Sequence, residues 1–106
     1  MSKPRIQRYA ADARVIRLGD AKPTMPVNSD KCRELVASLS GGSKPTAESL
    51  YVWRTTGFVV KKRGGPRVVL PSVYVGQTPM TDAPSVRRWW SRVKKEARAC
   101  GVQVTT

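Results

Sequence analysis

Lysine and arginine side chains gather in one stretch of the chain, between residues 44 and 67. This stretch has six cationic side chains and one carboxylate. Guanidinium and ammonium groups form charge-assisted hydrogen bonds with phosphate oxygens. Glycines in its most basic part allow the backbone to approach a ligand closely. The chemistry that this stretch indicates is the binding of a polyanion. Its cationic residues are Lys44, Arg54, Lys61, Lys62, Arg63 and Arg67.

The charge of the whole chain points the same way. The 106 residues include 20 Lys and Arg against 7 Asp and Glu, a formal net charge of +13. The excess is uneven, because residues 1–27 have six cations and two acids, residues 28–43 are balanced, and residues 83–106 have six cations and one acid. An excess of this size indicates an anionic partner, and nucleic acid is the commonest one.

The residue types that serve acid–base or metal chemistry are scarce. The chain has no histidine, and its two cysteines, Cys32 and Cys100, are far apart with no CxxC companion. The segment GGSKPT does not match a phosphate-binding loop, and no strand precedes it. We therefore expect a protein that is not an enzyme and that binds no cofactor and no metal ion. Both cysteines are expected to be buried free thiols, because they lie at apolar positions of predicted helices.

Two consecutive helices are predicted in the first half of the chain. Residues 29–39 have apolar residues at i, i+3, i+4 and i+7 from Cys32. Residues 45–56 form the second helix, with Pro45 in the first turn and Gly57 as its stop. The short connection between them contains two glycines, which is the spacing of a helix-turn-helix.

The last helix is predicted for residues 83–100, with Asp82 as its N-cap. Its apolar stripe includes Trp89, and the opposite side is covered by lysines and arginines. Trp53 and Trp89 are expected in the core because both lie at helical spacing from aliphatic residues. Trp90 is adjacent to Trp89 and is expected to be half exposed, which makes it a candidate for stacking on a nucleic-acid base.

Between these helices the apolar period changes to that of strands. Residues 58–80 contain runs of β-branched residues interrupted by KKRGGP, a strong turn signal. We expect two or three short strands in a hairpin, with residues 61–67 as a basic loop.

The remaining segments are assigned by composition. Residues 1–27 are expected to be a basic N-terminal arm, partly disordered, that contributes affinity and not fold. Within it, helical spacing from Ile6 to Ile16 indicates a short amphipathic helix, and the β-branched pair in ARVIRL (residues 13–18) indicates a strand equally well. Residues 28–101 are expected to be the folded domain, and residues 102–106 a tail. No run approaches the roughly 20 apolar residues that a membrane span needs, so we expect a cytoplasmic protein that does not contact a membrane.

Three segments together resemble the excisionase-like winged-helix domains, which are relatives of the MerR-type DNA-binding module. SLYVWRTTG (Ser49–Gly57) is similar to their second helix, which has a small hydroxyl residue, an aliphatic residue, Trp and a closing Gly. RVVLPSVYVG (Arg67–Gly76) is similar to the wing, and TDAPSVRRWWSRV (Thr81–Val93) to the helix that follows. The resemblance covers residues 30 to about 98, with the order and spacing of the segments preserved.

The resemblance implies an α+β fold, a small winged helix with a helix-turn-helix, a basic β-hairpin wing and a C-terminal helix. It also implies that the second helix, residues 45–56, reads the major groove and that the wing, residues 61–67, contacts phosphates. One departure is Val52, where the family often has Arg. With the basic residues above, the expected nucleic-acid-binding residues are Lys44, Ser49, Arg54, Lys61, Lys62, Arg63 and Arg67.

The function we expect is non-catalytic binding of double-stranded DNA, as a transcriptional regulator or a recombination directionality factor. Partners would then include DNA, a second copy of the chain on DNA, or a recombinase. An RNA-binding or ribosome-associated protein is the alternative, because basic arms and Arg-rich helices suit RNA equally well. A module that binds an acidic protein is the third possibility.

Overall fold

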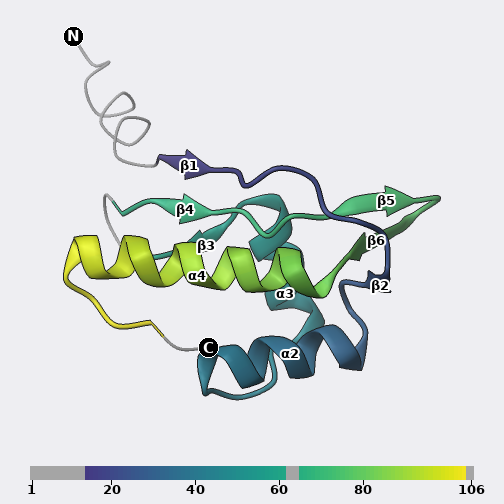
Figure 1. Cartoon of the computed structure of the whole chain (residues 1–106), viewed down its shortest axis with the longest axis horizontal. Coiled ribbons are helices and arrows are strands. Elements are labelled where there is room, and N and C mark those ends of the chain that lie inside the picture. The colour runs from purple at the N-terminus through teal and green to yellow at the C-terminus, as the bar shows by residue number, and fades with distance from the viewer. Residues whose placement is uncertain (1–13, 62–64, 105–106) are drawn as a thin grey trace, which may run out of the picture.

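Three helices and six short strands form the part of the chain that the structure, a computed structural model, describes: residues 14–61 and 65–104 (Figure 1). The expectation of an α+β fold is confirmed. In chain order the elements are β1 (Val15–Ile16), β2 (Met25–Pro26), α2 (Asp30–Ser40), α3 (Ala47–Thr55), β3 (Phe58–Val59), β4 (Arg67–Val68), β5 (Val73–Val75), β6 (Thr78–Thr81) and α4 (Ala83–Cys100).

The helices begin and end at the residues that cap them. The side chain of Ser29 accepts a hydrogen bond from the Cys32 backbone N–H at the start of α2. Gly41 ends α2 in the left-handed conformation with φ 71°. At α3, the Thr46 side chain accepts from the Ser49 backbone N–H, so Thr46 is the N-cap. Pro45 therefore precedes the helix, which corrects its predicted place in the first turn.

The strands form two sheets of three, with β4 and β6 central. In the first sheet β1 pairs parallel to β4, and β3 pairs antiparallel to β4. In the second, β6 pairs antiparallel to β2 and to β5. Residues 58–80, expected to hold two or three strands, thus hold four strands in two hairpins. Figure 1 shows the β5–β6 hairpin projecting beyond the rest of the fold.

Gly57 is required where the chain passes from α3 into β3. Its φ is 111°, and a Cβ there would lie 2.9 Å from the Cβ of Arg67. Any other residue would combine an unfavourable backbone conformation with a clash against β4. The glycine thus lets α3 pack closely above the first sheet.

A cluster of four aromatic rings lies where α3, α4 and the first sheet meet. The Trp89 ring centroid is 5.5 Å from that of Trp53, 5.8 Å from Phe58 and 5.6 Å from Trp90. The Trp89 indole N–H donates a hydrogen bond of 2.9 Å to the backbone carbonyl of Val68. Trp89 is fully buried and Trp53 partly buried, as expected.

Trp90 differs from its expected half-exposed state. Its side chain is buried, with its ring edge-on to Phe58 at 5.7 Å. The large side chains of Phe58 on β3 and Trp53 on α3 pack in the same cluster as Trp89 and Trp90. The core between α4 and the sheet is therefore wide enough to bury two adjacent tryptophans. Trp90 is therefore not a platform for base stacking.

The expectation that residues 1–27 form an arm outside the fold is wrong for residues 14–27. The side chains of Ile16, Ala21, Met25 and Val27 are buried, and Val27 is 0% exposed. Strands β1 and β2 each add an edge to a sheet whose other strands come from residues 58–81. The segment has few apolar residues, but long-range pairing places four of them, Ile16, Ala21, Met25 and Val27, in the core. Residues 1–13 lie outside the described part of the chain.

Glu96 joins the same N-terminal segment to α4. Its carboxylate accepts hydrogen bonds from Arg14 at 2.9 Å and from Arg92 at 2.8 Å. The Arg92 hydrogen bond is the largest influence and lowers the pKa of Glu96, burial acts in the opposite direction, and the charge of Arg14 lowers it further. The result is a pKa below the ordinary value of 4.5.

Replacement of Val27 by Ala tests whether residues 14–27 belong to the core. The substitution removes two methyl groups from a fully buried site, and we expect a loss of about 2 kcal/mol in the free energy of unfolding. Val15→Ala is the matched control, because Val15 is 45% exposed and should cost less than about 0.5 kcal/mol. Urea unfolding of both variants measures the difference. Equal midpoints would show that this segment does not contribute to the core.

Replacement of Glu96 by Gln should change the response of stability to acid. Because the folded-state pKa is lowered, the ion pairs stabilise the fold fully above the unfolded-state pKa near 4.5, and this stabilisation is lost as the pH falls through the lower folded-state value. We expect Glu96→Gln to cost about 1–2 kcal/mol at pH 7 and to make unfolding less dependent on pH below about 4.5. Glu34→Gln, an exposed control on α2, should leave the acid dependence of the parent intact.

Candidate functional site

The predicted site residues at the start of α3 are already engaged by neighbouring side chains. Lys44 lies 3.6 Å from the Asp30 carboxylate. The Ser49 hydroxyl accepts a hydrogen bond of 3.1 Å from the Thr46 hydroxyl, while the Ser49 backbone N–H donates to Thr46. Ser49 is half-buried, so its main structural part is in the capping of α3.

Arg54 connects the last turn of α3 to strand β5. Its Nη1 donates a hydrogen bond of 2.9 Å to the Tyr74 hydroxyl. The guanidinium carbon lies 5.0 Å from the centroid of the Tyr51 ring and 5.4 Å from that of Tyr74. A cation near two aromatic rings is attracted by both quadrupoles. The side chain of Arg54 is thus held in one position between the helix and the projecting hairpin.

The helix and the hairpin together expose several large side chains. Tyr51 is 56% exposed and Tyr74 is 61% exposed, and Val52 and Val75 beside them are also exposed. On α3 these residues lie opposite Leu50, which is buried in the core. The outward face of α3 and strand β5 therefore form one continuous surface. We call it the α3–β5 surface, and it consists of Tyr51, Val52, Arg54, Thr55, Tyr74 and Val75.

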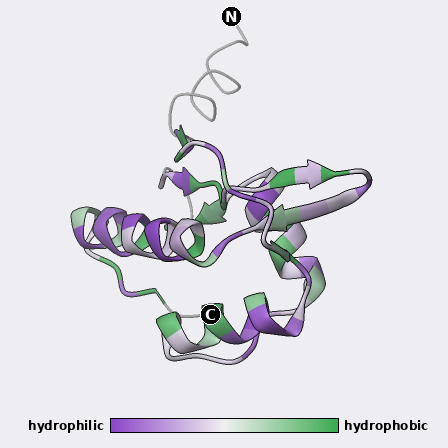
Figure 2. Cartoon of the chain, turned by 45° about the vertical axis from the view of Figure 1, so that its right-hand side comes forward, coloured by the Kyte–Doolittle hydropathy of each residue, from purple (hydrophilic) through white to green (hydrophobic). Residues whose placement is uncertain are grey.

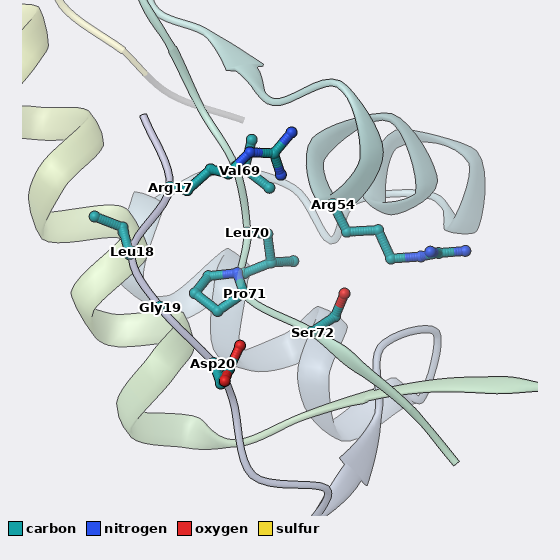
Figure 3. Close-up of a pocket in the computed structure, with 9 residues that line it drawn as sticks. All are labelled: Arg17, Leu18, Gly19, Asp20, Arg54, Val69, Leu70, Pro71 and Ser72. Atoms are coloured by element: carbon teal, nitrogen blue, oxygen red, sulfur yellow. The ribbon is translucent and has the colours of Figure 1, made fainter. Parts of the chain in front are cut away.

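A cleft of about 250 Å³ lies beside Arg54 (Figure 3). Its floor is the segment 69–72, whose Leu70 N–H donates to the Trp53 carbonyl and whose Val69 N–H donates to the Ile16 carbonyl. Arg17 and Asp20 line the cleft from the N-terminal segment, and Ser72 lines it from the floor. The segment 69–72 thus brings a second guanidinium, that of Arg17, close to the α3–β5 surface.

Arg54 retains unused hydrogen-bonding capacity in this cleft. Its Nε is buried and has no hydrogen-bond partner. A buried donor without a partner is unfavourable unless a ligand or water satisfies it. In Figure 3 the Arg54 guanidinium points away from Arg17, so the two cations do not converge on one position in the cleft.

The other predicted cations lie around the connection between β3 and β4. Lys61 is exposed, and Arg67 is half-buried on β4. Lys62 and Arg63 lie outside the described residues. Figure 1 shows β3 and β4 opening away from the β5–β6 hairpin, with α3 between the two hairpins. The structure therefore does not bring Lys61 and Arg67 together with Arg54.

The signals for Tyr51 and Tyr74 were missed in the sequence. The sequence predicts only that Tyr51 lies on a helix and Tyr74 on a strand. A contact between residues 20 or more positions apart leaves no periodic pattern in the sequence. Arg17 was assigned to an arm for the same reason. For these three residues the sequence offered only the residue types, two tyrosines and one arginine, as signals.

Features of other kinds of site are few among the described residues. Residues 14–61 and 65–104 contain no group of three or more Cys, Asp, Glu or His side chains that could hold a metal ion. Cys32 and Cys100 are free thiols, and burial raises the pKa of Cys32 to about 11. In the same residues, no helix has both the length and the apolar character needed to cross a membrane.

Comparisons with protein-family models, curated proteins and solved structures found no match to the chain. The geometry described above is therefore the basis of any functional assignment.

A double-mutant cycle tests the contact between Arg54 and Tyr74. We expect Arg54→Ala and Tyr74→Ala to be coupled by about 1 kcal/mol in the free energy of unfolding, because each removes the same hydrogen bond and cation–π contact. Arg54→Ala with Val75→Ala is the control cycle and should be additive within about 0.5 kcal/mol. Coupling indistinguishable from the control would show that helix and hairpin are not held together by this pair.

Proposed function

We propose that this chain is a non-catalytic protein that binds double-stranded DNA through a winged-helix arrangement. α2, a short connection and α3 would be the helix-turn-helix, and α3 would enter the major groove. The observation that carries the proposal is the contact of Arg54 with Tyr74. It joins the outward face of α3 to a projecting hairpin, and together they form a surface suited to one groove and its adjacent backbone.

The wing in this proposal is the β5–β6 hairpin and not the loop 61–67 alone. Residues Arg67–Gly76, which resemble the wing of excisionase-like domains, end at the turn of this hairpin. Strands β3 and β4 lie on the other side of α3 from this hairpin (Figure 1). The basic residues of this part of the chain, Lys61, Lys62, Arg63 and Arg67, would contact the backbone on that flank. Backbone contacts on both flanks would fix the position of α3 without reading sequence.

The base-reading residues in this proposal lie on the outward face of α3. Val52 would contact a thymine methyl group, and Thr55 could hydrogen-bond to a base edge. Ser49 and Lys44 are nearer the start of the helix and would make secondary contacts. Arg54, held by two tyrosines, would bind a phosphate and so position the helix.

A DNA-binding protein of this kind would act as a transcriptional regulator or as a recombination factor, with a second copy or a recombinase as its protein partner. Binding to RNA is the second candidate function. The observation that favours it is the pair of exposed tyrosines, because aromatic rings at a protein surface stack on unpaired bases. Competition between a DNA duplex and a structured RNA at one salt concentration separates the two.

A salt titration of binding to duplexes selected from a random pool tests the DNA proposal. Arg17→Ala and Lys61→Ala should each flatten the slope of log K against log salt by about 0.9, because each removes one phosphate contact. Val52→Ala and Thr55→Ala should leave the slope unchanged and reduce discrimination among sequences by roughly 1–3 kcal/mol per lost contact.

Lys31→Ala on α2 is the control for charge, because Lys31 is exposed and is not one of the residues proposed to contact DNA. If Arg17→Ala and Lys61→Ala alter the slope no more than this control, the proposed backbone contacts are wrong. If the tyrosine variants Tyr51→Ala and Tyr74→Ala abolish RNA binding and leave duplex binding intact, the RNA function is favoured instead.

A further inference from the structure

The outward faces of α3 and α4 point in opposite directions. Trp53 of α3 and Trp89 of α4 meet in the core with their ring centroids 5.5 Å apart. Each helix therefore turns its exposed residues away from the other. In the view of Figure 1, α4 lies in front of α3. A duplex bound to the α3–β5 surface would leave the outward face of α4 uncovered.

The outward face of α4 is densely cationic. Among the described residues of this helix, the one carboxylate is Glu96, which is buried and already accepts hydrogen bonds from Arg14 and Arg92. Arg92 pairs with Glu96, and the other cations of this helix make no ion pair within the described residues. Figure 2 shows hydrophilic positions recurring along the length of α4. The exposed cations are Arg87, Arg88, Lys94, Lys95 and Arg98.

A shallow groove of about 440 Å³ runs along this face. It is lined by Leu18, Arg87, Arg88, Ser91, Arg92 and Lys95. From Arg87 to Arg98 the helix extends roughly 16 Å, at 1.5 Å per residue. One strand of DNA presents a phosphate about every 3.4 Å along its axis. Over that length a strand winds through almost half a turn of the duplex, so the straight row of cations faces only those phosphates that lie on its side of the duplex.

The composition of this face favours a nucleic-acid backbone over a protein partner. The exposed large apolar side chains of the described residues are Val15, Tyr51, Val52, Val59, Tyr74 and Val75. None of them belongs to α4. Stable protein interfaces depend on buried aromatic or aliphatic anchors, whereas binding to a phosphate backbone depends on cations and the release of counterions.

We propose that the outward face of α4 is a second DNA-binding surface and that one copy of the chain bridges two duplex segments. This inference rests on the proposed binding of the first duplex by the α3–β5 surface. The second contact is to phosphates only, so it is independent of sequence. The protein would hold two DNA segments side by side with the aromatic core between them.

A capture assay tests the bridge. One duplex is fixed to beads, and a fluorescent duplex of the same sequence is added in solution with increasing amounts of the full chain. A single copy that bridges should capture the second duplex at intermediate concentration and release it in excess, because each duplex is then occupied by its own protein. Bridging by self-associated copies would not fall in excess, and that outcome would overturn the proposal.

The variant Arg87→Gln with Lys95→Gln removes two cations that make no ion pair with Glu96. We expect it to bind a single duplex through the α3–β5 surface and to lose most of the capture. The salt dependence of the remaining capture should be flatter by roughly 1.8 in log–log slope, for two lost phosphate contacts. Lys22→Gln with Lys31→Gln is the matched control, with two exposed cations removed from other elements, and should capture like the parent.

The outcomes separate this inference from the proposed function. If the parent chain fails to shift a single duplex in a gel, the proposed function is wrong. If it shifts a single duplex but captures no second one, only the bridge is wrong. In a further arm, an RNA duplex is added at equal concentration. If it prevents capture of the second DNA duplex while the first DNA duplex stays bound, that result would assign the α4 face to RNA and would also overturn the bridge.

Discussion

Trp89 makes the contact on which the rest of this structure depends. Its ring packs against Trp53, Phe58 and Trp90, and its indole N–H donates to the Val68 carbonyl at 2.9 Å. One side chain of α4 therefore fixes α3 through an aromatic contact and β4 through a hydrogen bond. A buried indole N–H needs such a partner, so the position of α4 above the sheet is set within the tolerance of one hydrogen bond.

That single point of contact determines which surfaces the molecule can offer. Because Trp53 faces Trp89, the residues on the other side of α3 must face solvent, and the same holds for the residues on the other side of α4. Gly57 then brings the chain from α3 into β3 with no space for a side chain against Arg67. The strands that follow leave the core on both sides of α3. The exposure of the outward face of α3 between the strands that flank it is thus a consequence of how the core packs.

The sequence was sufficient for the parts of this fold that local chemistry controls. The three described helices begin at hydroxyl or acidic residues and end near glycines, and capping and periodicity predicted them to within two residues. Of the two N-terminal strands, β1 lies in ARVIRL (residues 13–18), for which the sequence left helix and strand open. Strand β2 was missed because a two-residue strand has no period, and its burial depends on pairing with residues 80–81. Trp90 was misjudged for a similar reason. The width of a core depends on several elements at once, and adjacent residues on a helix do not reveal it.

The candidate site shows the same difference between features that local sequence predicts and features that depend on long-range contacts. Arg54 was predicted as one of the cations of residues 44–67, but its structural role comes from its hydrogen bond to Tyr74 on β5. Ser49 was chosen for its chemical type, and the structure uses that chemistry at the N-cap. Position in a helix thus identified the right element, while the partners that the fold supplies decide which side chains are free to meet a ligand. By this reasoning the side chains most available to a ligand are Val52 and the exposed cations of α4 other than Arg92, because Arg54 engages both tyrosines and Glu96 pairs with Arg92.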